Sequence, residues 1–177
     1  MSTPRPIGDG EYGDLLDRAV TAFRYEARDL YAIGEEHDDY VKFLQGIPRM
    51  PDQVGWWKQY LDQVAGRARQ GRTRSRVRVL AEPPTDYQRW LLWADPWYAA
   101  AGETIGYLGR RKAYELGLPD ADWWLLDDER AVILAFDDDG HIEQRTLVAG
   151  PGLIAKYRLW RDLAVRFSVP AAQIAAA

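Results

Sequence analysis

The amino-acid sequence predicts an α/β (α+β) fold in a single domain, in which N-terminal helices pack on a mixed five-stranded sheet and a C-terminal helix closes it. Three observations support this prediction. Residues 11–70 show the three- and four-residue apolar spacing of helices. Residues 72–80 switch to a period of two, which is typical of a strand. Residues 122–148 contain three short runs separated by turn residues, which favours three more strands.

Three helices are expected before the first strand. Residues 11–31 carry one apolar helical face. Residues 35–46 form a short helix that starts with acidic residues and ends at Gly46, and the two prolines of the following IPRMP segment make that segment a loop. The third helix covers residues 54–70 and carries several aromatic side chains.

Residues 72–80 begin a unit of strand, turn and helix. Two prolines end the strand, and the spacing of Thr85 and Gln88 is that of a capping box, which starts the next helix. A second strand at residues 104–108 and a short helix at residues 110–116 follow. The strand, helix and strand together predict one crossover unit of the sheet.

The last three strands are expected at residues 122–127, 130–136 and 141–148. An Asp-Glu pair joins the first two, and the DDDG segment at residues 137–140 has the composition of a hairpin turn. A Gly-Pro-Gly sequence ends the sheet, and residues 153–167 form the closing helix.

Length and composition fit one domain and exclude some kinds of site. The chain has 177 residues, of which 47% are hydrophobic and 28% charged, as in globular domains. It has no cysteine, so disulfides and thiolate zinc sites are excluded. We expect a disordered N-terminus at residues 1–10, the domain at residues 11–170 and a frayed tail at residues 171–177. No apolar stretch has the length of a signal-peptide core or a membrane span, so we expect a cytoplasmic protein that does not contact membranes.

Five segments occur in a distinctive order: AFRYEARDLY, RVRVLAEPPTDYQRW, AAGETIGYL, DADWWLLDDERAVILAFDDDG and YRLWRDLA. This order resembles an actinobacterial family known as domain of unknown function 6879, and the resemblance covers most of residues 11–170. The family brings no established activity with it. Its members are often found beside helix-turn-helix regulators, so the resemblance implies a regulatory setting.

A weaker resemblance, at the level of the fold, is to a degenerate half of a phospholipase D-like domain. The catalytic signature of that superfamily is H-x-K-x-x-x-x-D. With Asp127 as the final residue, Asp120 and Asp122 occupy the histidine and lysine positions. The nucleophile and the phosphate-binding lysine are missing, so we expect no phosphodiesterase chemistry by that route.

Six arginines lie within residues 67–78, a segment without acidic residues, although the net charge of the chain is −4. Three interpretations of this segment stay open. The arginines form a solvated strand face, bind an acidic partner such as residues 35–39 of the same chain, or bind phosphate and nucleic acid. The negative overall charge makes nucleic acid the least favoured of the three. The candidate anion or partner patch consists of Arg72, Arg74, Arg76 and Arg78.

Trp123 and Trp124 are adjacent in a predicted strand, so their side chains point to opposite faces of the sheet. One of them therefore faces a pocket or a partner, while core packing is favoured for most of the eight tryptophans. Aromatic side chains with a few polar groups form typical ligand sites. Paired carboxylates can share a proton or hold a metal, although turn and salt-bridge roles are favoured here. The candidate ligand- or partner-binding residues are Arg28, Tyr87, Arg89, Trp123, Trp124, Asp127 and Asp128.

The sequence offers little for metal or histidine chemistry. His37 and His141 are the two histidines, and neither has a metal-binding spacing. Residues 137–140 fit a hairpin turn better than a calcium loop. We therefore expect no catalytic residue, no metal and no cofactor.

The sequence as a whole predicts a non-enzymatic cytoplasmic binding protein in a regulatory module with a helix-turn-helix transcriptional regulator. One alternative is a small enzyme or ligand sensor with a pocket of aromatic, arginine and aspartate side chains, which binds a small molecule. A second alternative is nucleic-acid binding through the arginine-rich strand. Whether the chain forms a homo-oligomer stays open.

Overall fold

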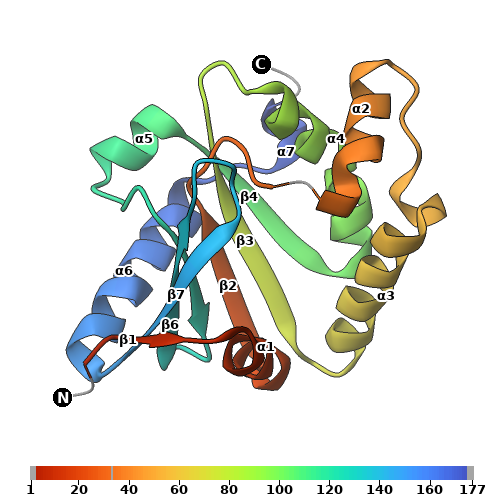
Figure 1. Cartoon of the computed structure of the whole chain (residues 1–177). Coiled ribbons are helices and arrows are strands. Elements are labelled where there is room, and N and C mark those ends of the chain that lie inside the picture. The colour runs from red at the N-terminus through yellow and green to blue at the C-terminus, as the bar shows by residue number, and fades with distance from the viewer. Residues whose placement is uncertain (1–2, 33, 175–177) are drawn as a thin grey trace.

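The computed structural model describes residues 3–32 and 34–174, in which seven strands form one mixed sheet (Figure 1). The strands are β1 (Arg5–Ile7), β2 (Thr21–Glu26), β3 (Thr73–Leu80), β4 (Glu103–Gly109), β5 (Asp122–Leu126), β6 (Arg130–Phe136) and β7 (Ile142–Ala149). Their order across the sheet is β1-β7-β6-β5-β2-β3-β4. Strands β2, β3 and β4 are parallel, and the other neighbours pair antiparallel.

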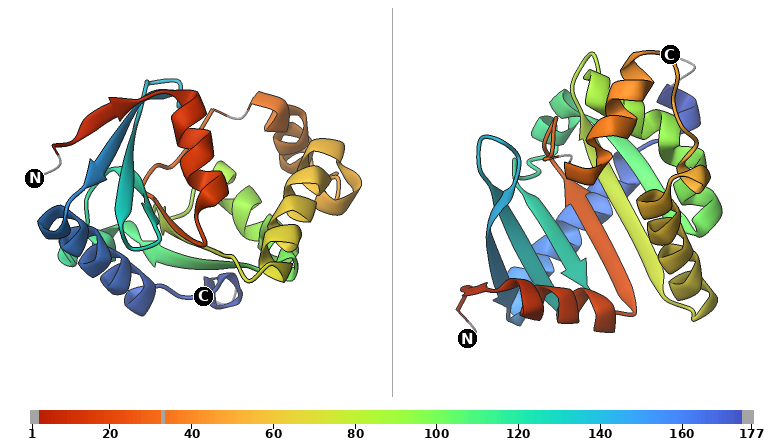
Figure 2. Two further views of the ribbon diagram at one scale, coloured as in Figure 1. Left: turned by 90° about the horizontal axis from the view of Figure 1, so that it is seen from below. Right: turned by 45° about the vertical axis from the view of Figure 1, so that its right-hand side comes forward.

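Helices cover both faces of this sheet (Figure 2). They are α1 (Asp9–Arg18), α2 (His37–Leu44), α3 (Gly55–Arg69), α4 (Asp86–Ala101), α5 (Arg110–Glu115), α6 (Pro151–Phe167) and α7 (Ala171–Ile174). Helix α6 lies on one face, and α1, α3 and α4 lie on the other. In the part of the chain that the structure describes, none of the helices has the length and hydropathy of a membrane span.

The predicted crossover unit is confirmed by β3, α4 and β4. Strands β3 and β4 pair in parallel, and α4 connects them. Thr85 and Gln88 form the expected capping box, with the Gln88 backbone N–H donating to the Thr85 hydroxyl at 3.2 Å. Gly102 ends the helix with a positive φ of 100°, a conformation that favours glycine. Local signals therefore placed this unit correctly.

The long helix predicted over residues 11–31 is wrong. Helix α1 ends at Arg18, and residues 21–26 form β2, which is central in the sheet and pairs with β3 and β5. Hydrogen bonds from two neighbouring strands override the helical spacing of the apolar residues, because they satisfy the backbone of β2 on both sides.

The predictions for the two chain ends also need correction. Residues 5–7 form β1, which pairs with β7, so this part of residues 1–10 is ordered; residues 1–2 lie outside the described residues. The sheet consequently has seven strands and not five. Residues 171–174 form α7, and its Ala171 and Ile174 pack against the core. Residues 175–177 lie outside the described residues.

The two faces of the sheet differ in chemistry. On the α6 face, β2, β3 and β5 present apolar side chains that join one hydrophobic cluster with α6: Phe23, Tyr25, Val77, Val79, Trp123 and Leu125. On the opposite face, the intervening positions of the same strands are charged or aromatic: Arg24, Glu26, Arg74, Arg76, Arg78, Asp122 and Trp124. We call this second side the charged face.

Candidate functional site

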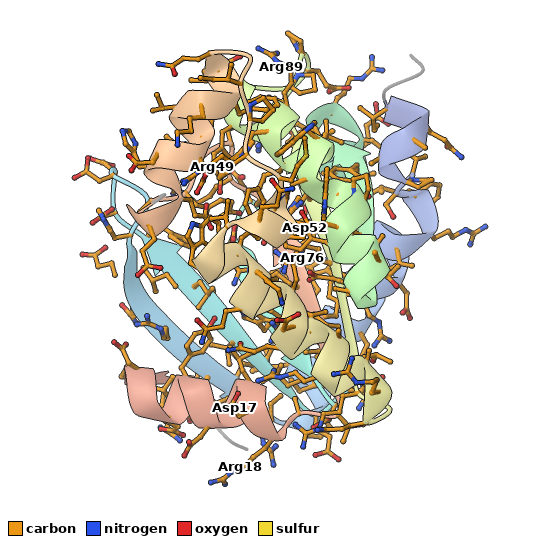
Figure 3. All side chains as sticks on the ribbon, turned by 90° about the vertical axis from the view of Figure 1, so that its right-hand side faces the viewer. Asp17, Arg18, Arg49, Asp52, Arg76 and Arg89 are labelled. Carbon is orange, nitrogen blue, oxygen red and sulfur yellow. The ribbon has the colours of Figure 1, made fainter. Side chains whose placement is uncertain are left out.

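A pocket with a volume of about 380 Å³ lies between the charged face and the helices that cover it. The sheet contributes six residues: Arg24, Glu26, Arg74, Arg76, Arg78 and Trp124. The helices and the segment before α2 contribute seven: Tyr31, Glu36, Trp56, Tyr60, Tyr87, Leu91 and Tyr98. Figure 3 shows Arg76 behind α3, at the sheet. The pocket thus has a largely cationic floor and a largely aromatic wall.

The register of the strands brings the floor residues together. Arg24 on β2 lies opposite Arg76 on β3 and opposite Trp124 on β5. Glu26 lies opposite Arg78 in the same way. Because alternate residues of a strand share a face, the arginines predicted to alternate along β3 all reach the same side of the sheet.

Glu26 is the centre of the ion network on this floor. Its carboxylate accepts hydrogen bonds from Arg76 Nη1 and from Arg78 Nε, both at 2.8 Å. Arg76 also donates from Nε to Glu103 at 2.7 Å. Burial by itself raises the pKa of Glu26, but the charges of Arg76, Arg78 and Arg24 outweigh it and lower the pKa to about 2. Glu26 is therefore ionised at neutral pH.

Arg24 is buried with incomplete hydrogen bonding. Its side chain donates from Nη2 to Asp122 at 2.8 Å, and only 8% of the residue is exposed. Its Nε has no hydrogen-bond partner among the described residues, since the nearest oxygen of Glu26 is 3.9 Å away. Buried donors are normally satisfied. This arginine consequently has donor capacity that the protein itself does not use.

Arg74 is the floor arginine without an ion pair. Within the described part of the chain, no carboxylate lies within 4.0 Å of its guanidinium and no acceptor is hydrogen-bonded to it. The guanidinium lies 5.3 Å from the ring centre of Trp124, and that of Arg24 lies 5.2 Å from the same ring. The indole N–H of Trp124 donates to the Tyr12 hydroxyl at 2.9 Å, which fixes the ring. Trp124 thus holds two guanidiniums at the floor.

The aromatic wall is held in place by contacts within and between the helices. Trp56 and Trp57 of α3 stack with ring centres 5.0 Å apart and an angle of 8°. The Trp56 N–H donates to the buried carboxylate of Asp39 at 3.1 Å, and Arg49 donates to the same group at 2.6 Å. These contacts connect α2 to α3, so the wall is largely preformed.

Glu36 lies at the helical side of the pocket, in the 3₁₀ turn before α2. Burial raises the pKa of its carboxyl to about 7, and the opposing charge of Arg78 limits this rise. Near neutral pH, Glu36 is therefore partly protonated and does not fully neutralise the arginines. Of the acidic segment at residues 35–39 considered as a partner for the arginines, Glu36 lines the pocket.

The structure brings some of the predicted site residues together in this pocket and places others elsewhere. Five of the predicted residues line it: Arg74, Arg76, Arg78, Tyr87 and Trp124. The ring of Trp123 stacks on Tyr25 on the opposite face of the sheet, with centres 5.5 Å apart. The solvated-face interpretation is wrong for Arg76 and Arg78, because both are paired with Glu26 inside the protein.

Three predicted arginines lie outside the pocket. Arg72 donates to the backbone oxygen of Asp17 at 2.5 Å. Arg28 lies over the Phe136 ring at 5.1 Å. Arg89 is exposed at the N-terminal end of α4, away from Arg76, as Figure 3 shows.

Asp127 and Asp128 form a tight turn between β5 and β6, with positive φ values of 52° and 56°. Asp127 accepts hydrogen bonds from the backbone N–H groups of Val20 and Thr21, at 2.9 and 2.8 Å. Asp128 pairs with Arg161 of α6. Both carboxylates thus position neighbouring elements, as the favoured interpretation of this pair expected.

The hairpin between β6 and β7 confirms the turn predicted at residues 137–140. Asp137, Asp139 and His141 bring possible metal-ligand atoms within 4.8 Å of one another, and all three residues are exposed. The Asp137 carboxylate accepts a hydrogen bond from the His141 backbone N–H at 2.8 Å, a typical turn contact. This contact gives Asp137 a role in the turn.

The sequence-based prediction missed two residues of the pocket floor, Arg24 and Glu26. The cause is the assignment of residues 21–26 to a helix. The alternation of Phe23 and Tyr25 with Arg24 and Glu26 was the signal of a strand with one apolar and one charged side.

Comparison with known proteins identifies the family of the chain. A model of the family described as a domain of unknown function (DUF6879) matches residues 11–176, nearly the whole chain. The protein therefore belongs to this family. No curated protein and no solved structure matches the chain.

Proposed function

We propose that this protein is a binding protein that holds a small organic molecule in the pocket on the charged face. The observation that carries the proposal is the pocket itself. Its volume of about 380 Å³ lies within the range of small-molecule sites, and its wall is aromatic with a few charged groups. Side chains that are fixed before binding lose little freedom when a ligand enters, which favours affinity.

The buried charges beside the pocket support the same proposal. Arg76 and Arg78 share Glu26, and Arg24 pairs with Asp122, all within the protein interior. Apolar side chains of similar size would stabilise such an interior as well or better, because burying charges requires their desolvation. Buried charges next to a cavity are therefore better explained by a ligand than by stability.

Nucleic-acid binding is less well supported by this arrangement. Binding to a phosphate backbone needs exposed cationic side chains that can replace counterions. Arg78 is 5% exposed, and its Nε is engaged by Glu26. Arg76 is engaged by Glu26 and Glu103. We therefore propose that the arginine strand serves the pocket.

We further propose that ligand binding serves regulation in the cytoplasm, with a helix-turn-helix regulator as the partner. This part rests on the resemblance of the chain to a family whose members are often found beside such regulators. A ligand bound between the sheet and α3 or α4 would shift these helices and so alter their outer surface. A partner protein would recognise the altered surface.

Native mass spectrometry tests the binding proposal. The purified protein is incubated with a cellular extract of small molecules, desalted and measured intact. We expect a defined mass increment that is lost in Trp124→Ala, because this change removes one side of the pocket. Trp97→Ala is the matched control, since Trp97 packs on Trp93 outside the pocket with ring centres 5.3 Å apart. An increment that Trp124→Ala retains in full would contradict the proposal, as would the absence of any increment.

A further inference from the structure

We infer that the ligand is a flat organic carboxylate, whose acid group binds at Arg74 and Arg24 and whose apolar body lies against the aromatic wall. This inference rests on the proposed function, because it assigns the chemical class of the molecule that the pocket holds.

The charges on the floor favour an anionic ligand. Four guanidiniums border the pocket, and three of them are paired with carboxylates of the protein: Arg24 with Asp122, Arg76 with Glu26 and Glu103, and Arg78 with Glu26. Arg74 has no such partner among the residues that the structure describes. A guanidinium presents its donors in a planar fork that matches a carboxylate. Arg74 is therefore free to form an ion pair with an acid group of the ligand.

A second and independent observation points to the same place. Arg24 is more than nine-tenths buried, borders the pocket, and keeps its Nε without an acceptor. Both guanidiniums lie against the one ring of Trp124, so the two partly unused arginines are neighbours. An oxyanion near Trp124 would interact with both.

The balance of charge favours a carboxylate over a phosphate. One floor guanidinium is left without a carboxylate, and this single positive charge fits a monoanion. A phosphate ester carries close to two negative charges at neutral pH. Glu36 adds further negative charge on the opposite side of the pocket as it ionises, which also disfavours a dianion.

The aromatic wall defines the rest of the ligand. Tyr87 and Leu91 of α4 are buried, and together with Tyr98 they face the floor across the pocket. Flat apolar molecules make the best contacts with aromatic rings, either stacked or edge to face. The ligand class is thus an aromatic or similarly flat acid.

The test is a set of flat carboxylates, each measured beside its neutral amide by isothermal titration calorimetry. The pairs are benzoate and benzamide, 2-naphthoate and 2-naphthamide, and indole-3-acetate and its amide. The phosphate ester 2-naphthyl phosphate is measured for comparison. We expect at least one acid to bind at least tenfold more tightly than its amide and than the phosphate. In Arg74→Gln, the affinity for the acid should fall to nearly that for the amide. Arg74→Lys should restore part of the preference for the acid.

Arg72→Gln is the matched control. Arg72 precedes Arg74 by two residues and lies outside the pocket, so this variant should keep the preference for the acid. Three results would overturn the inference: equal binding of acid and amide, tighter binding of the phosphate, or an acid preference that Arg74→Gln retains. No binding of any pair would overturn it as well. The binding proposal would still stand if native mass spectrometry found a mass increment on the wild type that Trp124→Ala loses, so the two failures are distinguishable.

Discussion

The two faces of the central sheet are built from the same strands but differ in what they bury. Adjacent residues make the contrast sharpest. Trp123 is 1% exposed and contacts Tyr25 and Tyr157 in a solid apolar core. Trp124, one residue further, contacts two guanidiniums and borders a cavity. One strand therefore serves both stability and the candidate site.

The two faces are therefore expected to contribute differently to the free energy of unfolding. The α6 face buries apolar side chains, which is the main favourable contribution to folding. The charged face also buries apolar clusters under α1, α3 and α4, but around Arg74 it buries ion pairs, whose attraction is largely offset by desolvation. We expect changes on the α6 face to affect mainly folding, and changes around Arg74 to affect mainly binding.

The largest effect is expected for Trp123→Ala. Loss of a fully buried aromatic side chain leaves a cavity, so the free energy of unfolding should fall by about 3–5 kcal/mol. Trp124→Ala should lower it by less, because part of the indole faces the pocket. Urea denaturation of both variants measures the difference. A larger loss for Trp124→Ala would contradict the division between the two faces.

Glu26→Gln should have the next largest effect. This change removes the carboxylate that Arg76 and Arg78 share and leaves two buried guanidiniums partly unpaired, which should lower the free energy of unfolding by about 3 kcal/mol. Glu11→Gln is the control, since Glu11 pairs with Arg5 on the surface, and its loss should lower the free energy of unfolding much less. Similar losses in the two variants would show that the network on the charged face is not tightly coupled.

The pH dependence of stability should carry opposite contributions from two glutamates. The folded state lowers the pKa of Glu26 to about 2, so its contribution is present above the ordinary value of 4.5 and is lost as the pH falls from there towards 2. The folded state raises the pKa of Glu36 to about 7, so the protein loses stability as the pH rises from 4.5 to 7.

Glu36→Gln isolates the second of these contributions. The variant should match the wild type near pH 4 and exceed its free energy of unfolding by about 1 kcal/mol at pH 8, after allowance for partial exposure. Urea denaturation at the two pH values measures this. A stability difference that does not change with pH would contradict the assignment.

Arg74→Gln should have the smallest effect on folding. Its guanidinium is without a carboxylate partner in the described structure, so the free energy of unfolding should change by less than about 1 kcal/mol. Arg78→Gln, four residues further along β3, should lower it by several times as much, because Arg78 is buried and paired with Glu26. Equal losses in the two denaturation curves would contradict the view that Arg74 is kept for a ligand.

The sequence predicted those parts of the fold that depend on local signals. Thr85 and Gln88 mark the start of α4, and the alternating arginines mark β3, because a cap and a strand period lie within a few residues. Strand β2 was missed, since its apolar residues also fit a helix and its pairing partners are distant in the chain.

The candidate site was predictable only in part for the same reason. Alternation predicted that one of Trp123 and Trp124 would face a pocket or a partner, but only the packing of α6 decides which. The pair of Arg24 and Asp122 joins residues 98 positions apart, which no local pattern reveals. Arg89 was a candidate, yet α4 places its side chain at the surface, where it pairs with Asp86.

Fluorine NMR on protein labelled with 5-fluorotryptophan tests most directly that the charged face holds the ligand. The resonances of Trp123 and Trp124 are assigned from Trp123→Phe and Trp124→Phe variants, and 2-naphthoate is then titrated into the wild type. We predict that the Trp124 resonance shifts in a saturable manner while that of Trp123, on the opposite face of the sheet, stays in place. A bound ligand that shifts Trp123 and leaves Trp124 unchanged would contradict the site.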